Sequence, residues 1–233
     1  ADVLERAGEL IRSGELVAFP TETVYGLGAN AYLAESARKV YAAKGRPSDN
    51  PLIVHVNDSA DASLFAETNE TYKKLAKQFM PGPLTVILPK KDVIPDEVTG
   101  GLRTVAVRCP SNPIARELIR RSGVPIAAPS ANLSGKPSPT CAEHVMQDMD
   151  GRIAMVIDGG ECEIGLESTV IAVSGNSANV LRPGAVTPDM LRSAGIAVTV
   201  DEAVTDPAKA GSAPQSPGMK YKHYAPKAEL YLV

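Results

Sequence analysis

The stretch that decides the fold is LVAFPTETVYGLG at residues 16–28, followed by the helical pattern of residues 33–43. Residues 16–19 form a short apolar run with the length and composition of a buried strand. Pro20 ends this strand because proline has no amide hydrogen to give to a sheet. A buried strand that passes through a polar turn into an amphipathic helix predicts an α/β protein.

The polar turn between that strand and that helix is the first candidate binding site. Thr21 and Thr23 follow the carboxyl end of the strand, which is where ligands bind in open α/β sheets. Gly26 and Gly28 are expected either to let the backbone approach a ligand or to take a positive φ in the turn. The turn is therefore predicted to face a ligand.

A second candidate site follows the helix, in the sequence KGRPSDNPLIVH at residues 44–55. Lys44 and Arg46 flank a glycine, and Pro47 prevents the helix from continuing. Lysine offers a compact charge and arginine a planar fork, so the pair suits a phosphate chain. The alternative is a solvated helix end, where both cations meet the negative end of the helix dipole.

Composition limits the class of protein. The chain has 233 residues, 44% of them hydrophobic, enough for one α/β domain of roughly 200 residues and an appendage. The net charge of −3 argues against a uniformly basic nucleic-acid-binding surface but leaves a local basic patch open. Cys109, Cys141 and Cys162 show no CxxC spacing, so we expect small buried hydrophobes. Without a signal peptide or a run of about 18 apolar residues, we expect a cytoplasmic protein with no membrane segment.

Strand and helix patterns alternate along the chain. Strands are expected at residues 16–19, 52–56, 84–88, 104–108, 125–128, 155–158 and 168–173, and helices at residues 2–13, 33–43, 70–78, 113–121, 141–149 and 188–194. Residues 168–181 also allow a hairpin, which would add antiparallel pairs. The prediction is an α/β fold with a twisted, mixed open sheet flanked by helices.

Further polar residues follow other expected strands. Arg108 ends one strand, and Ser130 and Asn132 follow another. Residues 165–170 and 181–184 also place polar and charged side chains at strand ends. Serine and asparagine in such turns most often only stabilise the turn. Hydroxyl, amide and arginine side chains gather at these expected strand ends. The sequence shows neither an acid/base dyad nor the Ser-His-Asp order of a catalytic triad. This combination indicates catalysis by positioning and charge stabilisation, as in phosphoryl or nucleotidyl transfer.

The composition changes after about residue 204. Residues 206–217 are rich in Ala, Pro, Ser and Gly, which is typical of a linker or flap. Residues 216–226 then read SPGMKYKHYAP, a segment expected either to close over a ligand or to dock on the surface through its aromatics. Residues 228–233 have the pattern of a new strand.

Six motifs, in order PTETVYGLG, KGRP, PSANLSG, ESTV, RPG and SPGMKYKHYAP, resemble the threonylcarbamoyl-AMP synthase family, often called YrdC-like. The tail is similar to the longer, two-domain branch. The resemblance implies a single YrdC-like catalytic domain at residues 1–205, a linker or active-site flap at 206–227, and at 228–233 the start of a second domain that is otherwise expected to be missing.

The resemblance implies a reaction in which L-threonine, bicarbonate or CO2, and ATP give L-threonylcarbamoyl-adenylate and pyrophosphate. Mg²⁺ would bind the phosphates, and no residue of the chain is assigned as a metal ligand. The product would pass to a tRNA threonylcarbamoyl transferase that modifies an adenosine beside the anticodon. Weak RNA binding is compatible with this role.

The resemblance also implies roles for single residues. Lys44 and Arg46 are the expected catalytic pair, with Arg46 between the substrate and the phosphates. The expected ATP-binding residues are Lys44, Ser48, Thr104, Ser130, Asn132, Ser138, Arg182 and Tyr224. The expected threonine-binding residues are Thr21, His55, Arg108, Ala128 through its backbone, and Ser168. His55 lies in an apolar run, where a structural histidine is an equal alternative.

Two other classes of function stay open. One is a carbamoyltransferase domain that makes carbamoyl-adenylate from carbamoyl phosphate, which supplying carbamoyl phosphate in place of threonine and bicarbonate would reveal. The other is a double-stranded RNA-binding module, which salt-dependent RNA binding without ATP turnover would reveal. The acidic balance of the chain counts against RNA binding as the main role.

Overall fold

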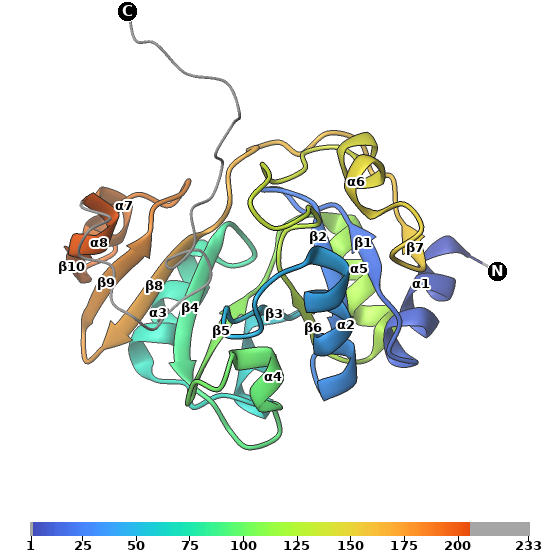
Figure 1. Cartoon of the computed structure of the whole chain (residues 1–233). Helices are drawn as coiled ribbons and strands as arrows, with labels where there is room; N and C mark the ends of the chain where they lie inside the picture. Colours follow the sequence, from blue (N-terminus) through green and yellow to red (C-terminus); the bar gives the residue numbers. More distant parts are fainter. Residues whose placement is uncertain (1, 206–233) are drawn as a thin grey trace, which may run out of the picture.

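The computed structural model describes residues 2–205, and one mixed sheet runs through them (Figure 1). Its strand order is β10-β9-β8-β4-β5-β3-β6-β2-β1-β7. The strands are β1 (Val17–Phe19), β2 (Gly26–Asn30), β3 (Ile53–His55), β4 (Leu84–Pro89), β5 (Thr104–Arg108), β6 (Ile126–Ala128), β7 (Met155–Val156), β8 (Thr169–Ser174), β9 (Ser177–Arg182) and β10 (Ala197–Val200). The helices are α1 (Val3–Arg12), α2 (Ala34–Lys44), η1 (Ser59–Leu64, a 3-10 helix), α3 (Glu70–Phe79), α4 (Asp96–Thr99), α5 (Pro113–Ser122), α6 (Ala142–Met149), α7 (Pro188–Ser193) and α8 (Glu202–Thr205).

Parallel and antiparallel pairs both occur in the sheet, as the sequence predicts. β3 and β5 pair in parallel, whereas β4 pairs antiparallel with β5 and parallel with β8. Figure 1 shows α1 and β7 near one end of the sheet and α7, α8 and β10 at the other. The predicted α/β fold with a mixed open sheet flanked by helices is therefore confirmed.

Local sequence explains how α2 and α5 end and begin. α2 ends at Gly45, whose φ of 58° lies in the left-handed region that favours glycine. The chain turns there, and Arg46 leaves the helix axis. α5 begins after Asn112, whose side chain accepts hydrogen bonds from two backbone amides, and Pro113 occupies the first turn.

The central strands place alternate residues on opposite faces of the sheet. Val54 of β3 and Val107 of β5 belong to the large core, together with apolar residues of α2, α3 and α7. Ile53 and Ala106 belong to a separate apolar cluster whose buried members all come from strands. Within residues 2–205, this part of the second face therefore has no helix in its core cluster.

The remainder of the second face is covered by α1 and α5. Ile11 of α1 and Leu118 of α5 pack against Phe19 and Ile126 of β1 and β6. The helices thus cover one end of the face, and the neighbouring strands β3, β5, β4 and β8 form a floor that no helix of residues 2–205 covers, the uncovered floor. That floor positions the candidate site.

Of the two alternatives for Gly26 and Gly28, the positive φ is wrong. Both lie in β2, which pairs with β1 and β6, and neither has a positive φ. A Cβ at Gly28 would lie 2.9 Å from side-chain atoms of both Ile126 and Phe19. Gly28 is required because the strand packs closely on an aromatic ring.

The other expected elements are present within two residues of the expected bounds, and the hairpin that the sequence allowed is formed by β8 and β9. The short elements η1, α4, β10 and α8 were not expected. Cys109 is buried as expected, whereas Cys141 and Cys162 are half-buried. Among residues 2–205, no helix has both the length and the apolar character needed to cross a bilayer.

Candidate functional site

The uncovered floor carries a row of polar residues in register. His55 of β3 lies opposite Arg108 of β5, and Arg108 lies opposite Thr85 of β4. Residues directly opposite one another on paired strands share a face. The next row toward the strand interiors is apolar, with Ile53, Ala106 and Ile87. The floor therefore has a polar edge beside an apolar surface.

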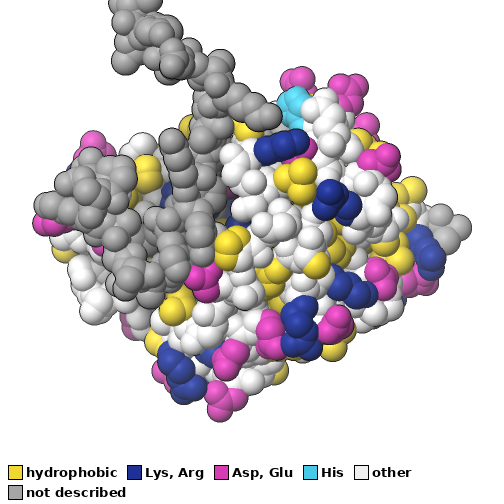
Figure 2. Space-filling model, in the orientation of Figure 1, with side chains coloured by type: hydrophobic (Ala, Val, Ile, Leu, Met, Phe, Trp, Pro, Cys, Tyr) yellow, Lys and Arg dark blue, Asp and Glu magenta, His cyan; other side chains and the backbone are white. Residues whose placement is uncertain are grey.

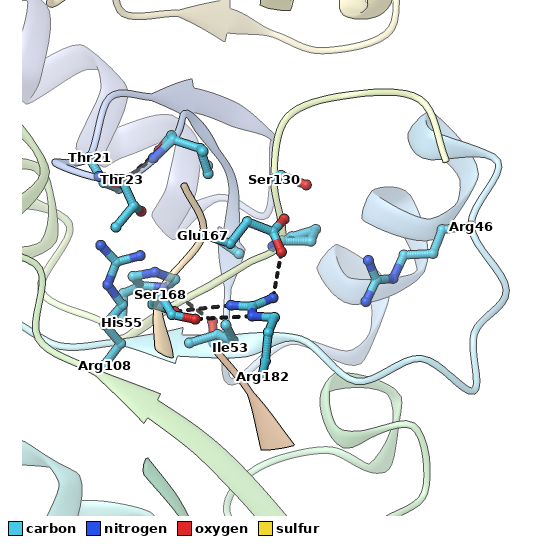
Figure 3. Close-up of a pocket in the computed structure, with 14 residues that line it drawn as sticks. Thr21, Thr23, Arg46, Ile53, His55, Arg108, Ser130, Glu167, Ser168 and Arg182 are labelled. Atoms are coloured by element: carbon cyan, nitrogen blue, oxygen red, sulfur yellow. Dashed lines mark hydrogen bonds and ion pairs between the residues drawn. The ribbon is translucent and has the colours of Figure 1, made fainter. Parts of the chain in front are cut away.

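A cleft that is partly open to solvent lies over this floor (Figure 3). In Figure 3, Thr21, Thr23 and Arg108 lie at one end, Arg46 at the other, and Glu167 and Arg182 between them. Its lining residues are Thr21, Thr23, Val24, Gly26, Arg46, Ile53, His55, Arg108, Ala128, Pro129, Ser130, Glu167, Ser168 and Arg182.

A buried ion pair forms one end of the cleft. Arg108 donates a hydrogen bond from Nη2 to Oε1 of Glu22 at 2.7 Å, and both side chains are 4% exposed. Thr21 shapes the adjoining turn, because its hydroxyl donates to the carbonyl of Val24 at 2.6 Å. Arg108 is thereby held at the edge of a polar pocket, in a position suited to a carboxylate.

A second arginine–glutamate pair lies in the middle of the cleft. Arg182 donates to Glu167 Oε2 at 2.6 Å, and the same guanidinium donates to the backbone oxygen and the hydroxyl of Ser168 at 3.0 and 3.1 Å. Ser138 donates to the other carboxylate oxygen of Glu167 at 2.9 Å. The three residues around Glu167 are therefore joined in one hydrogen-bond network.

The loop after α2 brings a third arginine to the cleft. Arg46 contacts the carbonyls of Asn50 and Pro51 at 3.3 and 3.1 Å. Lys44 is buried, so the alternative of a solvated helix end does not hold for it. Its ammonium donates to the carbonyls of Ser130 and Asn132, and burial lowers the pKa of Lys44 to about 7. Lys44 thus joins α2 to the loop that carries Ser130.

His55 lines the cleft as a neutral side chain. Burial, followed by the positive charge of Arg108, lowers the pKa of His55 to about 3. Its Nδ1–H donates to the carbonyl of Ile53 at 3.0 Å, and its ring lies edge-on to Phe19 with centroids 6.2 Å apart. His55 therefore combines a structural role with a position in the cleft wall.

Eight of the residues that the sequence indicated meet in the cleft: Thr21, Arg46, His55, Arg108, Ala128, Ser130, Ser168 and Arg182. Lys44 and Ser138 contact lining residues, and Asn132 adjoins them through Lys44. Thr104 is not brought to the cleft, because it begins β5 while Arg108 ends it. Ser48 is exposed on the loop after α2, and Tyr224 lies outside the described residues.

Sequence reasoning gave no role to Glu22, Glu167 or Thr85. Glu22 stands inside the PTETVYGLG motif and Glu167 beside Ser168, so a signal was present for both. Thr85 lies in an ordinary apolar strand pattern and gave none.

The geometry defines an α/β protein with an arginine-lined cleft on its sheet. Three arginines reach the cleft, and within residues 2–205 no group of three or more His, Cys, Asp or Glu side chains is placed to hold a metal ion. Figure 2 shows acidic and basic side chains interspersed on the visible described surface. Arg46, Arg108 and Arg182 are the basic side chains that line the cleft, beside the acidic Glu167.

Comparison with known proteins identifies the family. The Sua5/YciO/YrdC family model, described as "Telomere recombination", matches residues 9–184, and a model of the C-terminal domain of threonylcarbamoyl-AMP synthase matches residues 186–233. The chain belongs to the Sua5/YciO/YrdC family. The expectation that the second domain is missing is wrong, because the second model matches through residue 233.

Individual relatives extend the comparison. Threonylcarbamoyl-AMP synthase of Bacillus subtilis is 53% identical over 97% of this chain and 65% of the relative. The crystal structure of Pyrococcus abyssi Sua5 complexed with L-threonine is 50% identical, with a TM-score of 0.93 over 97% of this chain and 66% of that one. The chain thus spans about two thirds of the length of these relatives. Full-length HypF is 19% identical with a TM-score of 0.69 over 77% of this chain and 28% of its own, a likeness of fold alone.

Proposed function

We propose that this protein forms L-threonylcarbamoyl-adenylate and pyrophosphate from L-threonine, bicarbonate or CO2, and ATP. The observation that carries the proposal is the 53% identity, over 97% of the chain, to a relative named threonylcarbamoyl-AMP synthase. The arrangement of the cleft supports it, since Arg108 at one end suits a carboxylate, and Arg46 and Arg182 along its length suit a phosphate chain.

The proposed reaction has two steps. The threonine amine attacks the carbon of CO2, a C–N bond forms, and the amine releases a proton to give a carbamate. A carbamate oxygen then attacks the α-phosphorus of ATP, and the bond to the leaving pyrophosphate breaks. Arg46 and Arg182 stabilise the charge that develops on the phosphates. Thr21 and Ser168 contribute hydroxyls at the amino-acid end, and Lys44 keeps the loop of Ser130 in place.

Mg²⁺ is proposed as the companion of ATP and not as a metal held by the protein. Mg²⁺ usually keeps several waters and binds phosphate oxygens with few protein ligands. The metal would supply neutralisation of phosphate charge.

The partners are proposed on the same basis. The adenylate is a labile mixed anhydride, so an enzyme that transfers the threonylcarbamoyl group to tRNA must take it up soon after release. A cytoplasmic location would suit this transfer. No feature of the cleft specifically favours the carbamoyltransferase or the RNA-binding alternative.

A direct test incubates the protein with ATP, Mg²⁺, labelled bicarbonate and each of threonine, serine and valine. We expect labelled adenylate with threonine and at least about tenfold less with valine, because valine leaves a polar group of the pocket unpaired. Omission of Mg²⁺ should abolish the product. Equal turnover of threonine and valine would contradict a hydroxyl-reading pocket. An adenylate formed from labelled carbamoyl phosphate, supplied in place of threonine and bicarbonate, would favour the carbamoyltransferase.

A further inference from the structure

Thr85 is a buried hydroxyl beside the cleft that the proposed mechanism does not use. It lies in β4 opposite Arg108, and its side chain is 0% exposed. Its hydroxyl oxygen lies 2.8 Å from Oγ of Ser168, and this is its hydrogen-bond contact within residues 2–205. Ser168 itself lines the cleft.

The protons of this contact can be assigned by counting. A threonine or serine hydroxyl has one proton and two lone pairs. Arg182 donates to Oγ of Ser168 at 3.1 Å and occupies one lone pair. If Ser168 donated to Thr85, the Thr85 proton would be buried with no described acceptor, which is costly. Thr85 therefore donates to Ser168 and occupies its second lone pair.

With both lone pairs occupied, Ser168 has only its own proton left to offer. We propose that Thr85 is a positioning residue that fixes the Ser168 hydroxyl as a hydrogen-bond donor into the cleft, where it binds an acceptor oxygen of the amino-acid substrate. A carboxylate oxygen meets this requirement and an ammonium group does not. The substrate amine is thereby directed away from Ser168. The identity of the substrate rests on the proposed function.

The test compares two variants that differ in one hydroxyl. Thr85→Val keeps the shape and removes the donor, whereas Thr85→Ser keeps the donor. We expect the Kd of L-threonine, measured by calorimetry, to rise about tenfold in Thr85→Val and to stay near the wild-type value in Thr85→Ser. Thermal unfolding curves check that each variant is folded. Should Thr85→Val fail to fold, Thr85→Ala against Thr85→Ser gives the same comparison.

A double-variant cycle separates this role from general packing. If Thr85 acts through Ser168, adding Thr85→Val to Ser168→Ala causes no further rise in Kd. A wild-type Kd for Thr85→Val, or a full additional rise in the Ser168→Ala background, would overturn the proposal while leaving the proposed function intact. A wild-type protein that binds threonine neither alone nor with ATP would overturn both.

Discussion

The two arginine–glutamate pairs of the cleft differ in how far they are removed from water. In the pair of Glu22 and Arg108 both side chains are 4% exposed, whereas in the pair of Glu167 and Arg182 they are 19% and 17% exposed. The buried pair makes one contact and leaves Glu22 Oε2 and Arg108 Nε buried without a described hydrogen-bond partner. Such a pair is a poor source of stability, and its value lies in fixing Arg108 in the cleft.

The largest effect is expected from breaking the buried pair. Glu22→Ala leaves the Arg108 charge buried and uncompensated, so the free energy of unfolding should fall by about 3–5 kcal/mol. Glu167→Ala, in the more exposed pair, should cost less than Glu22→Ala. Urea denaturation measures both. Glu22→Ala combined with Arg108→Met should recover most of the loss, and equal losses in the two single variants would refute the comparison.

Variants of the two arginines should differ in which substrate's KM they raise. Arg108→Lys keeps the charge but loses the planar fork, so the KM for threonine should rise about tenfold to a hundredfold, roughly 1.4–2.7 kcal/mol, with little change for ATP. Arg182→Lys should raise the KM for ATP by more than the KM for threonine, although Arg182 also donates to Ser168. Steady-state pyrophosphate release measures both. If Arg182→Lys raised only the KM for threonine and left the KM for ATP unchanged, the assignment of the two arginines would be reversed.

Low pH should lower the free energy of unfolding through the buried side chain of His55. The folded-state pKa of His55, about 3, lies below its ordinary value of 6.5, so only the unfolded chain binds this proton between those pH values. Stability is therefore lost as pH falls below about 6.5, by about 1.4 kcal/mol at pH 5.5. His55→Gln should remove this part of the pH dependence of urea unfolding. His144→Gln, at an exposed position, is the matched control and should leave it unchanged.

The smallest change in the free energy of unfolding is expected from breaking an exposed ion pair. Lys73 and Glu70 form an ion pair on α3 with side chains 61% and 89% exposed. Lys73→Ala should change the free energy of unfolding by less than about 0.5 kcal/mol. A larger loss in the same urea experiment would show that burial does not govern the cost of breaking these pairs.

Sequence periodicity predicted β4, β5 and α5 well because their apolar spacing matches the packing that stabilises them. It failed at β2, where the sequence GLGAN has weak strand character and the strand forms through pairing with β1 and β6 on both sides. A tertiary contact overrode the local preference there.

The candidate site shows the same limit. Residues in polar turns after strands, such as Thr21 and Ser130, could be predicted because strand ends gather at one edge of a sheet. The contact between Glu22 and Arg108 joins positions 86 residues apart, and that between Thr85 and Ser168 joins positions 83 apart. No local pattern encodes such contacts, so only the folded chain reveals them.

The alternation along β5 has a consequence for folding itself. Val107 packs into the helix-covered core, and Arg108, the next residue, faces the cleft. A slip of β5 by one residue would drive the arginine into that core without a partner and expose the valine. The cation that is proposed to bind substrate therefore also penalises a misregistered sheet, so a chain that misassembles here is denied a stable alternative fold.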